Sequence, residues 1–150
     1  MRDYIFRLFR AQYGDEKDAY WEKGITDKTV KIAAYNRSLD TDLDDRLPPE
    51  TYLEVLEMKK VVEAKPVWPW FKSVFNIPEP NEKGQAKNLK WMERINELRR
   101  IPAHPAKERK YKVEDFEYID FIYDEFTKRL STAMKAQDTA FLDPVLGEDD

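Results

Sequence analysis

The segment WMERINELRRIPAHP, residues 91–105, combines the end of a helical pattern with the only histidine of the chain. Apolar side chains recur here at the spacing of one helical face, at Trp91, Met92, Ile95 and Leu98. The pattern begins at about Gln85. Pro102 disfavours helical geometry in the residue before it, so the helix is expected to end near Ile101.

Two adjacent arginines near this helix end are expected to point in different directions. Arg99 follows Trp91 and Ile95 at steps of four, so it should leave the helix on the core-facing side. Arg100 is rotated by about 100 degrees toward solvent. A guanidinium and an imidazole close together can hold a phosphate and move a proton. Arg99 and His104 are therefore the candidate site residues.

The composition favours an all-α fold. Hydrophobic residues make up 41% of the chain and charged residues 37%, which suits helices with a packed interior and a charged surface. Only four glycines are present, and no alternating run of strand length stands out. Because 150 residues suit one domain, we expect a single-domain bundle of about five helices over residues 1–142 and a disordered acidic tail over 143–150.

Several classes of protein are excluded by the same composition. The absence of cysteine excludes disulfides, thiolate metal sites and cysteine nucleophiles, and is typical of a cytoplasmic protein. No apolar run approaches the twenty or so residues needed to cross a bilayer, so no membrane contact is expected. The net charge of -4 argues against binding nucleic acid by bulk electrostatics, and any contact with RNA must be local.

Helices before and after the central segment are predicted from the same periodicity. They cover residues 3–13, closed by Gly14, residues 26–38, capped by Thr26 or Asp27, a third helix opened by Pro48-Pro49, and a last helix over 114–137. The aromatic cluster at 67–75 has two interpretations, a packed core or an exposed platform for stacking bases. We favour the core, because clustered large aromatic side chains are usually buried.

One short basic stretch surrounds His104 in this acidic chain. Between Arg99 and Lys112 there are six Arg or Lys residues and one Glu. The candidate phosphate-binding residues of this stretch are Arg100, Lys107, Arg109 and Lys110. The alternative is a solvated basic loop in which Arg99 and His104 only complete the helix end.

The last predicted helix has apolar residues on two faces. One face contains Phe116, Ile119, Tyr123 and Phe126, and the other contains Tyr118, Phe121 and Ile122. Two apolar faces require two neighbours, either the bundle and a second subunit, or two sides of a monomeric bundle.

The motif Leu98-Arg99-Arg100-Ile101-Pro102-Ala103-His104 resembles the signature of the HEPN superfamily, commonly written Leu-Arg-Asn-x-x-Ala-His. The match is Arg99, four residues, and His104. Tyr13-Gly14, Tyr20-Trp21 and residues 22–25 resemble the opening of the HEPN branch found with PIN-domain transcript-surveillance endoribonucleases and prokaryotic conflict-system proteins. The resemblance extends from about residue 5 to residue 130. It departs from the pattern at Arg100, where the family usually has Asn, and at Pro102 and Pro105.

The resemblance implies metal-independent RNA cleavage without a cofactor, in RNA processing or in defence against foreign nucleic acid. The ribose 2'-hydroxyl would attack the adjacent phosphate, with His104 as general base or acid and Arg99 stabilising the added negative charge. Family members commonly assemble this site from two copies in a homodimer. Arg100 leaves an alternative open, a non-catalytic RNA-binding or dimerisation module of a larger multidomain protein, and a purely structural helical domain is the third interpretation.

Overall fold

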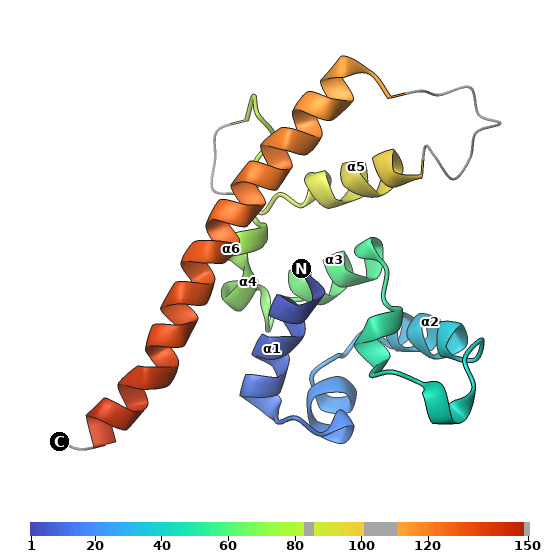
Figure 1. Ribbon diagram of the computed structural model, residues 1–150, viewed down its shortest axis with the longest axis vertical. Coiled ribbons are helices and arrows are strands. Elements are labelled where there is room, and N and C mark those ends of the chain that lie inside the picture. Colours follow the sequence, from blue (N-terminus) through green and yellow to red (C-terminus); the bar gives the residue numbers. More distant parts are fainter. Residues whose placement is uncertain (83–85, 101–110, 149–150) are drawn as a thin grey trace. The chain divides into compact units, whose positions relative to one another are not determined.

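The computed structural model describes residues 1–82, 86–100 and 111–148, and it describes side chains as far as Ala136. Regular structure in these ranges is entirely helical, which confirms the all-α prediction (Figure 1). The chain divides into two compact units, Met1–Trp68 and Pro69–Asp150, where the sequence predicts one domain. We call them the N-terminal unit and the C-terminal unit.

Aromatic packing holds the first elements of the N-terminal unit together. Helix α1, Arg2–Tyr13, buries Phe6 and Phe9 on its amphipathic face and ends, as predicted, at Gly14. The π-helical turn η1, Asp18–Lys23, buries Tyr20 and Trp21. The Phe6 ring lies 6.3 Å from that of Tyr20, at 75°, and 6.0 Å from that of Trp21. These aromatic contacts fix η1 against α1.

Helix α2, Lys28–Ser38, begins at one of its two predicted caps. The Asp27 carboxylate accepts hydrogen bonds from the backbone N–H groups of Thr29, at 2.9 Å, and Val30, at 3.4 Å. These bonds satisfy two of the N–H groups that a helix start leaves unpaired. Val30, Ala34 and Ser38, spaced four apart, form its buried face.

The prediction that Pro48-Pro49 opens the third α-helix is wrong. The two prolines instead begin a short 3-10 turn, η3, Pro49–Tyr52, which follows the 3-10 turn η2, Leu43–Asp45. Leu53 is extended, so it ends η3, and helix α3, Val55–Glu63, begins after it. Glu54 and Glu57 form a capping box at that start, which is a stronger start signal than the proline pair.

The C-terminal unit has an aromatic core shared by three helices. Helix α4, Trp68–Phe75, buries Phe71 and Phe75, which confirms the core interpretation of the aromatic cluster for these two rings. In helix α5, Lys90–Arg99, the Trp91 indole N–H donates to the Phe75 carbonyl oxygen at 2.8 Å. Phe126 of helix α6, Val113–Glu148, lies 5.5 Å from the Phe75 ring and 5.6 Å from that of Trp91.

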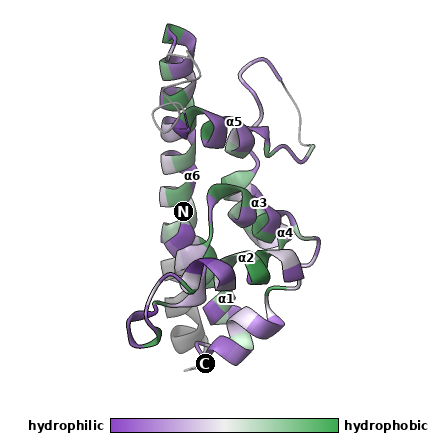
Figure 2. Cartoon of the chain, turned by 90° about the vertical axis from the view of Figure 1, so that its right-hand side faces the viewer, coloured by the Kyte–Doolittle hydropathy of each residue, from purple (hydrophilic) through white to green (hydrophobic). Residues whose placement is uncertain are grey.

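Helix α6 differs from its prediction in length and in burial. It continues past the predicted end at residue 137 to Glu148, and so includes most of the segment predicted to be a disordered tail. Hydrophobic and hydrophilic residues both occur along the part of α6 that is coloured in Figure 2. Of its two predicted apolar faces, one buries Tyr118 and Ile122, whereas Phe116 and Tyr123 of the other are 55% and 69% exposed.

Candidate functional site

Two of the predicted site residues lie in the described part of the chain. Arg99 is the last residue of α5, and Arg100 follows it at the C-cap, where its backbone N–H donates to the Glu97 carbonyl oxygen at 3.1 Å. The other predicted site residues, His104, Lys107, Arg109 and Lys110, lie outside the described residues. The structure therefore describes the two ends of the segment that contains the candidate site, namely the end of α5 and the start of α6.

Arg99 and Arg100 are both exposed, and the predicted difference in direction between their side chains stays a prediction. Arg99 Nε donates a hydrogen bond of 2.8 Å to the Oδ1 atom of Asn96, one turn earlier. Asn96 is itself buried, only 4% exposed. A buried amide therefore helps to orient the Arg99 guanidinium, and Asn three residues before Arg is the sequence signal that would have identified it.

Tyr111 links the two ends of the connection between α5 and α6. Its hydroxyl donates to the Leu98 carbonyl oxygen at 2.7 Å, and this bond satisfies one of the carbonyls that a helix end leaves unpaired. The Tyr111 ring also packs on Phe116 of α6, with centroids 5.4 Å apart. The sequence analysis missed this role. The chain thus leaves α5 at Arg100 and returns next to Leu98.

The start of α6 is fixed by a buried carboxylate. Asp115 is 5% exposed, and its Oδ2 atom accepts a hydrogen bond from the Lys112 backbone N–H at 2.9 Å. A carboxylate in the first turn also stabilises the helix, because it interacts favourably with the positive end of the helix dipole. Both sides of the connection therefore have defined positions within the C-terminal unit.

The positive charge at the end of α5 comes from arginine side chains and not from the helix dipole. A helix C-terminus carries partial negative charge, so the dipole of α5 does not favour an anion there. Arg99 and Arg100 reverse that sign locally with two permanently charged guanidinium groups. An anion at this end would be bound by the guanidinium groups of the two arginines, whose paired N–H donors match two phosphate oxygens.

The C-terminal unit also contains a pocket whose lining is mostly acidic, in contrast to the two arginines at the end of α5. This pocket, of about 680 Å³, is lined by Glu79, Glu82, Glu114 and Glu117 around Arg94 and Tyr118. The Arg94 guanidinium carbon lies 3.7 Å from the centroid of the Tyr118 ring, and the Tyr118 hydroxyl donates to Glu79 at 3.2 Å. Burial, followed by the negative charge of Glu79 and this hydrogen bond, raises the pKa of Tyr118 above its ordinary value. The excess of carboxylates makes this pocket unsuitable for phosphate.

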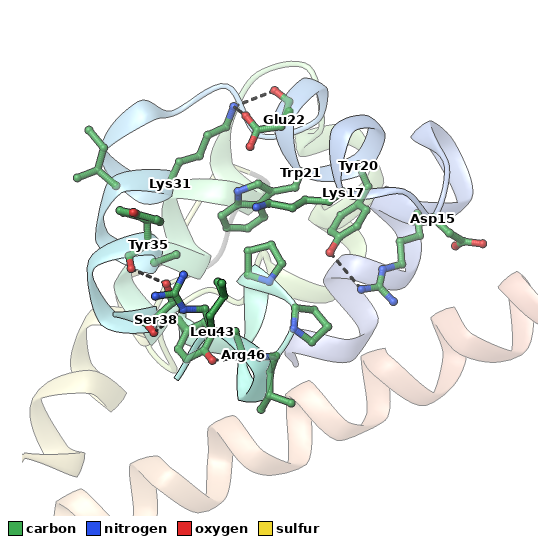
Figure 3. Close-up of a pocket in the computed structure, with 17 residues that line it drawn as sticks. Asp15, Lys17, Tyr20, Trp21, Glu22, Lys31, Tyr35, Ser38, Leu43 and Arg46 are labelled. Atoms are coloured by element: carbon green, nitrogen blue, oxygen red, sulfur yellow. Dashed lines mark hydrogen bonds and ion pairs between the residues drawn. The ribbon is translucent and has the colours of Figure 1, made fainter. Parts of the chain in front are cut away.

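The N-terminal unit contains an open groove of about 760 Å³ (Figure 3). Aromatic residues Trp21, Tyr35 and Tyr52 and the proline pair provide much of its lining. Lys31 lies at the rim, where its Nζ donates to the Glu22 carbonyl oxygen at 2.8 Å. Sequence reasoning missed this groove, because its residues lie on several successive elements that meet only in the folded N-terminal unit.

Beside the groove lies a network around the buried Glu50 carboxylate. Glu50 accepts hydrogen bonds from the Tyr20 hydroxyl, at 2.7 Å, and from Arg10 Nη2, at 2.6 Å. The Arg10 guanidinium also lies over the Tyr20 ring, 4.6 Å from its centroid. Burial, followed by the hydrogen bond to Glu50, raises the pKa of Tyr20. The network joins α1, η1 and η3, and we assign it a structural role.

Two further features, a metal-binding cluster and a membrane-spanning helix, are absent from the described residues. No group of three or more His, Cys, Asp or Glu side chains in these ranges is arranged to hold a metal ion. No helix in the described part of the chain is both long and apolar enough to cross a membrane.

Comparison with protein-family models, with curated proteins and with solved structures gives no match to this chain.

Proposed function

We propose that this chain is an RNA-associated domain of the HEPN type, with its RNA contact at the connection between α5 and α6. One observation carries the proposal: the exposed Arg99 and Arg100 side chains stand at the end of α5, directly before the basic stretch that contains His104. The anionic groups of RNA are its phosphates, and the planar guanidinium group of arginine binds a phosphate through two parallel hydrogen bonds. The net charge of -4 restricts the contact to this local stretch.

The small number of cations gives the proposal a quantitative consequence. Six Arg or Lys side chains occupy residues 99–112, and each phosphate contact on single-stranded RNA contributes about -0.7 to the slope of log affinity against log salt. For each copy of the chain that contacts the RNA, the slope should therefore be no steeper than about -4. A steeper slope would place RNA on another surface.

We further propose that the domain cleaves RNA without a metal ion. Arg99 would hold the scissile phosphate, and His104 would transfer the proton as the ribose 2'-hydroxyl attacks, leaving a cyclic phosphate and a free 5'-hydroxyl. Two copies of the motif would form the site in a homodimer, in RNA processing or in defence against foreign nucleic acid. The hydrogen bond that Arg99 donates to Asn96 supports this role, because it restricts the Arg99 side chain before substrate binds.

The test is incubation of the full chain with end-labelled single-stranded RNA in EDTA. Cyclic-phosphate ends are expected, and both His104→Ala and Arg99→Ala should abolish them, whereas only the arginine variant should weaken RNA binding. Lys72→Ala, which removes an exposed cation of α4, is the matched control and should change neither property. Cleavage that persists in His104→Ala would contradict the catalytic proposal.

A non-catalytic RNA-binding or dimerisation module of a larger protein is the second candidate. It is favoured by Arg100, which occupies the position where the HEPN pattern has Asn. For such a module, RNA should bind without cleavage, and binding should weaken as salt rises. A chain that neither binds nor cleaves RNA would contradict both candidates and leave the structural interpretation.

A further inference from the structure

The groove of the N-terminal unit contains a hydrogen-bond donor for which the described residues provide no acceptor. Trp21 lines the groove and is only 3% exposed (Figure 3). Its indole N–H donates to none of the described residues, and the fully buried side-chain nitrogens without a partner in these ranges belong to Arg2 and Arg10. The Trp21 N–H therefore still touches solvent, and the groove is where it does so. Because an indole N–H only donates, a ligand that covers it must bring an acceptor.

Two cations of the groove lining form no ion pair with the described residues. Lys17 stands at the start of η1, four residues before Trp21, and both side chains line the groove. Arg46 donates from Nε to two backbone carbonyl oxygens, at 3.2 and 3.3 Å, and these bonds orient its guanidinium without neutralising its charge. An anion in the groove would therefore meet two positive charges that no carboxylate of the described residues pairs.

The other charges of the lining leave the groove with a positive surplus. Lys31 lies 3.6 Å from a carboxylate oxygen of Glu22, and Arg10 lies 2.6 Å from one of Glu50. Asp15 is the remaining carboxylate of the lining, so it balances only one of the two unpaired cations. The groove is thus positively charged in a chain whose net charge is -4.

Apolar side chains make up much of the rest of the groove. Four of them are each more than half exposed, namely Ile32, Tyr35, Leu43 and Leu47. An apolar ligand that covers them would release the water that now contacts them. The volume of about 760 Å³ lies in the range of sites that hold small molecules. The groove therefore suits a ligand with an apolar body and a charged end.

We propose that this groove binds a small organic carboxylate with an apolar or aromatic body. The carboxylate accepts the hydrogen bond of the Trp21 N–H and pairs with Lys17, and the body lies against the exposed apolar side chains. A single negative charge matches the single surplus positive charge of the lining, whereas a cation would meet repulsion and a neutral ligand would leave the surplus unpaired. The groove lies in the N-terminal unit, so its ligand is independent of the RNA contact proposed for the C-terminal unit.

The first test follows the indole N–H signals of the full chain by heteronuclear NMR during titration with naphthoate. Each of the four tryptophans gives one such signal, and the one missing from Trp21→Phe is that of Trp21. Naphthoate should shift this signal and leave the other three in place. The matched naphthamide has the same shape without the charge and should bind about tenfold more weakly, and naphthylmethylammonium should not shift the signal.

The second test removes the charge of Lys17 and measures both probes by titration calorimetry. Lys17→Gln should raise the Kd of naphthoate about tenfold and leave that of naphthamide unchanged, because only the carboxylate pairs with the ammonium group. Lys23→Gln is the matched control at an exposed lysine of η1 outside the lining, and should change neither Kd. Lys17 makes no capping hydrogen bond through its side chain, so its replacement should not unfold η1.

Three outcomes would overturn the assignment of this ligand. A Trp21 signal that stays in place up to millimolar naphthoate would show that the groove holds no such anion. Equal Kd values for naphthoate and naphthamide would show that the groove does not select the carboxylate. Equal losses in Lys17→Gln and Lys23→Gln would show that naphthoate responds to the general charge of η1 and not to the groove.

Discussion

Glu50 is a buried carboxylate whose position depends on two donors from other elements. Its side chain accepts from Tyr20 and Arg10, and its residue is only 7% exposed. A carboxylate out of water is tolerated only where donors replace its hydration. The hydrogen bonds therefore decide whether η3 can close against α1 and η1.

Glu50→Ala should destabilise the chain by about 1–3 kcal/mol, because Tyr20 and Arg10 then lose their acceptor. Urea unfolding followed by circular dichroism measures the change. Glu16→Ala, at an exposed glutamate, is the control and should stay within about 0.5 kcal/mol. Equal losses in the two variants would show that the network adds nothing to stability.

The titration of Tyr118 makes the free energy of unfolding depend on pH in a direction that follows from its raised pKa. Burial and Glu79 raise the pKa of its phenol in the folded chain, so the folded state keeps this proton at a pH where the unfolded state releases it. The contribution of this proton to the free energy of unfolding is fully present below about pH 10, the ordinary tyrosine pKa, and is lost as the pH rises further.

Tyr118→Phe should therefore reduce the loss of stability above about pH 10, measured by urea unfolding across that range. Tyr123→Phe changes an exposed tyrosine of the same helix and should leave the pH profile as it is. If the two variants show the same profile, Tyr118 does not titrate differently in the folded chain.

At the scale of elements, Gly24 sets how closely η1 can approach α1. A Cβ atom added at Gly24 would lie 2.2 Å from the Tyr20 carbonyl oxygen and 2.9 Å from Cδ1 of Phe9. The backbone at Gly24 is right-handed, so the requirement for glycine is one of space and not of conformation.

Gly24→Ala should cost about 1–3 kcal/mol through overpacking, and thermal unfolding should show the lowered Tm. Ala11→Ser, at an exposed position of α1, is the control and should change stability by less than about 0.5 kcal/mol. A Tm equal to that of the control would show that the backbone of η1 and the Phe9 ring can shift to admit a methyl group.

The elements that sequence predicted best are those with strong local signals. Gly14 ends α1 and Asp27 caps α2 as predicted, because glycine at a helix end and aspartate at a helix start act through their own backbone neighbours. The predicted start of the third helix is wrong, because proline also suits the first turn of a 3-10 helix, and the capping box at Glu54 is the local signal that marks the start of α3. The end of α6 was set too early, since no glycine or proline stops the pattern at residue 137.

The candidate site could be predicted only in part. Sequence spacing placed Arg99 and Arg100 at the end of α5, but helical phase alone could not give the direction of a long side chain. The contact of Arg99 with Asn96 depends on a buried amide, and the contact of Tyr111 with Leu98 joins residues on different elements. Such pairings follow from packing, which periodicity along one element does not report.

At the scale of the whole molecule, the division into two units bears on how the chain unfolds. The network around Glu50 lies entirely in the N-terminal unit, and the cluster of Phe75, Trp91 and Phe126 lies entirely in the C-terminal unit. Each unit therefore has its own core, so one cooperative transition is not required.

Differential scanning calorimetry should give a calorimetric enthalpy larger than the van't Hoff enthalpy, as expected for two units that unfold separately. Glu50→Ala should lower the Tm of one component and leave the other unchanged. A single transition with equal enthalpies, shifted as a whole by Glu50→Ala, would show that the two units unfold as one.

The hydrogen bond from Tyr111 to Leu98 also bears on how this protein can diversify. It fixes where the chain leaves α5 and where it enters α6, whatever residues lie between. Closing a loop costs little more free energy as the loop lengthens, so the connection can gain or lose residues while its anchors stay in place. Lengthening the connection between His104 and Tyr111 should therefore leave the fold of the C-terminal unit in place, whereas a change in the spacing from Arg99 to His104 would separate the two proposed site residues.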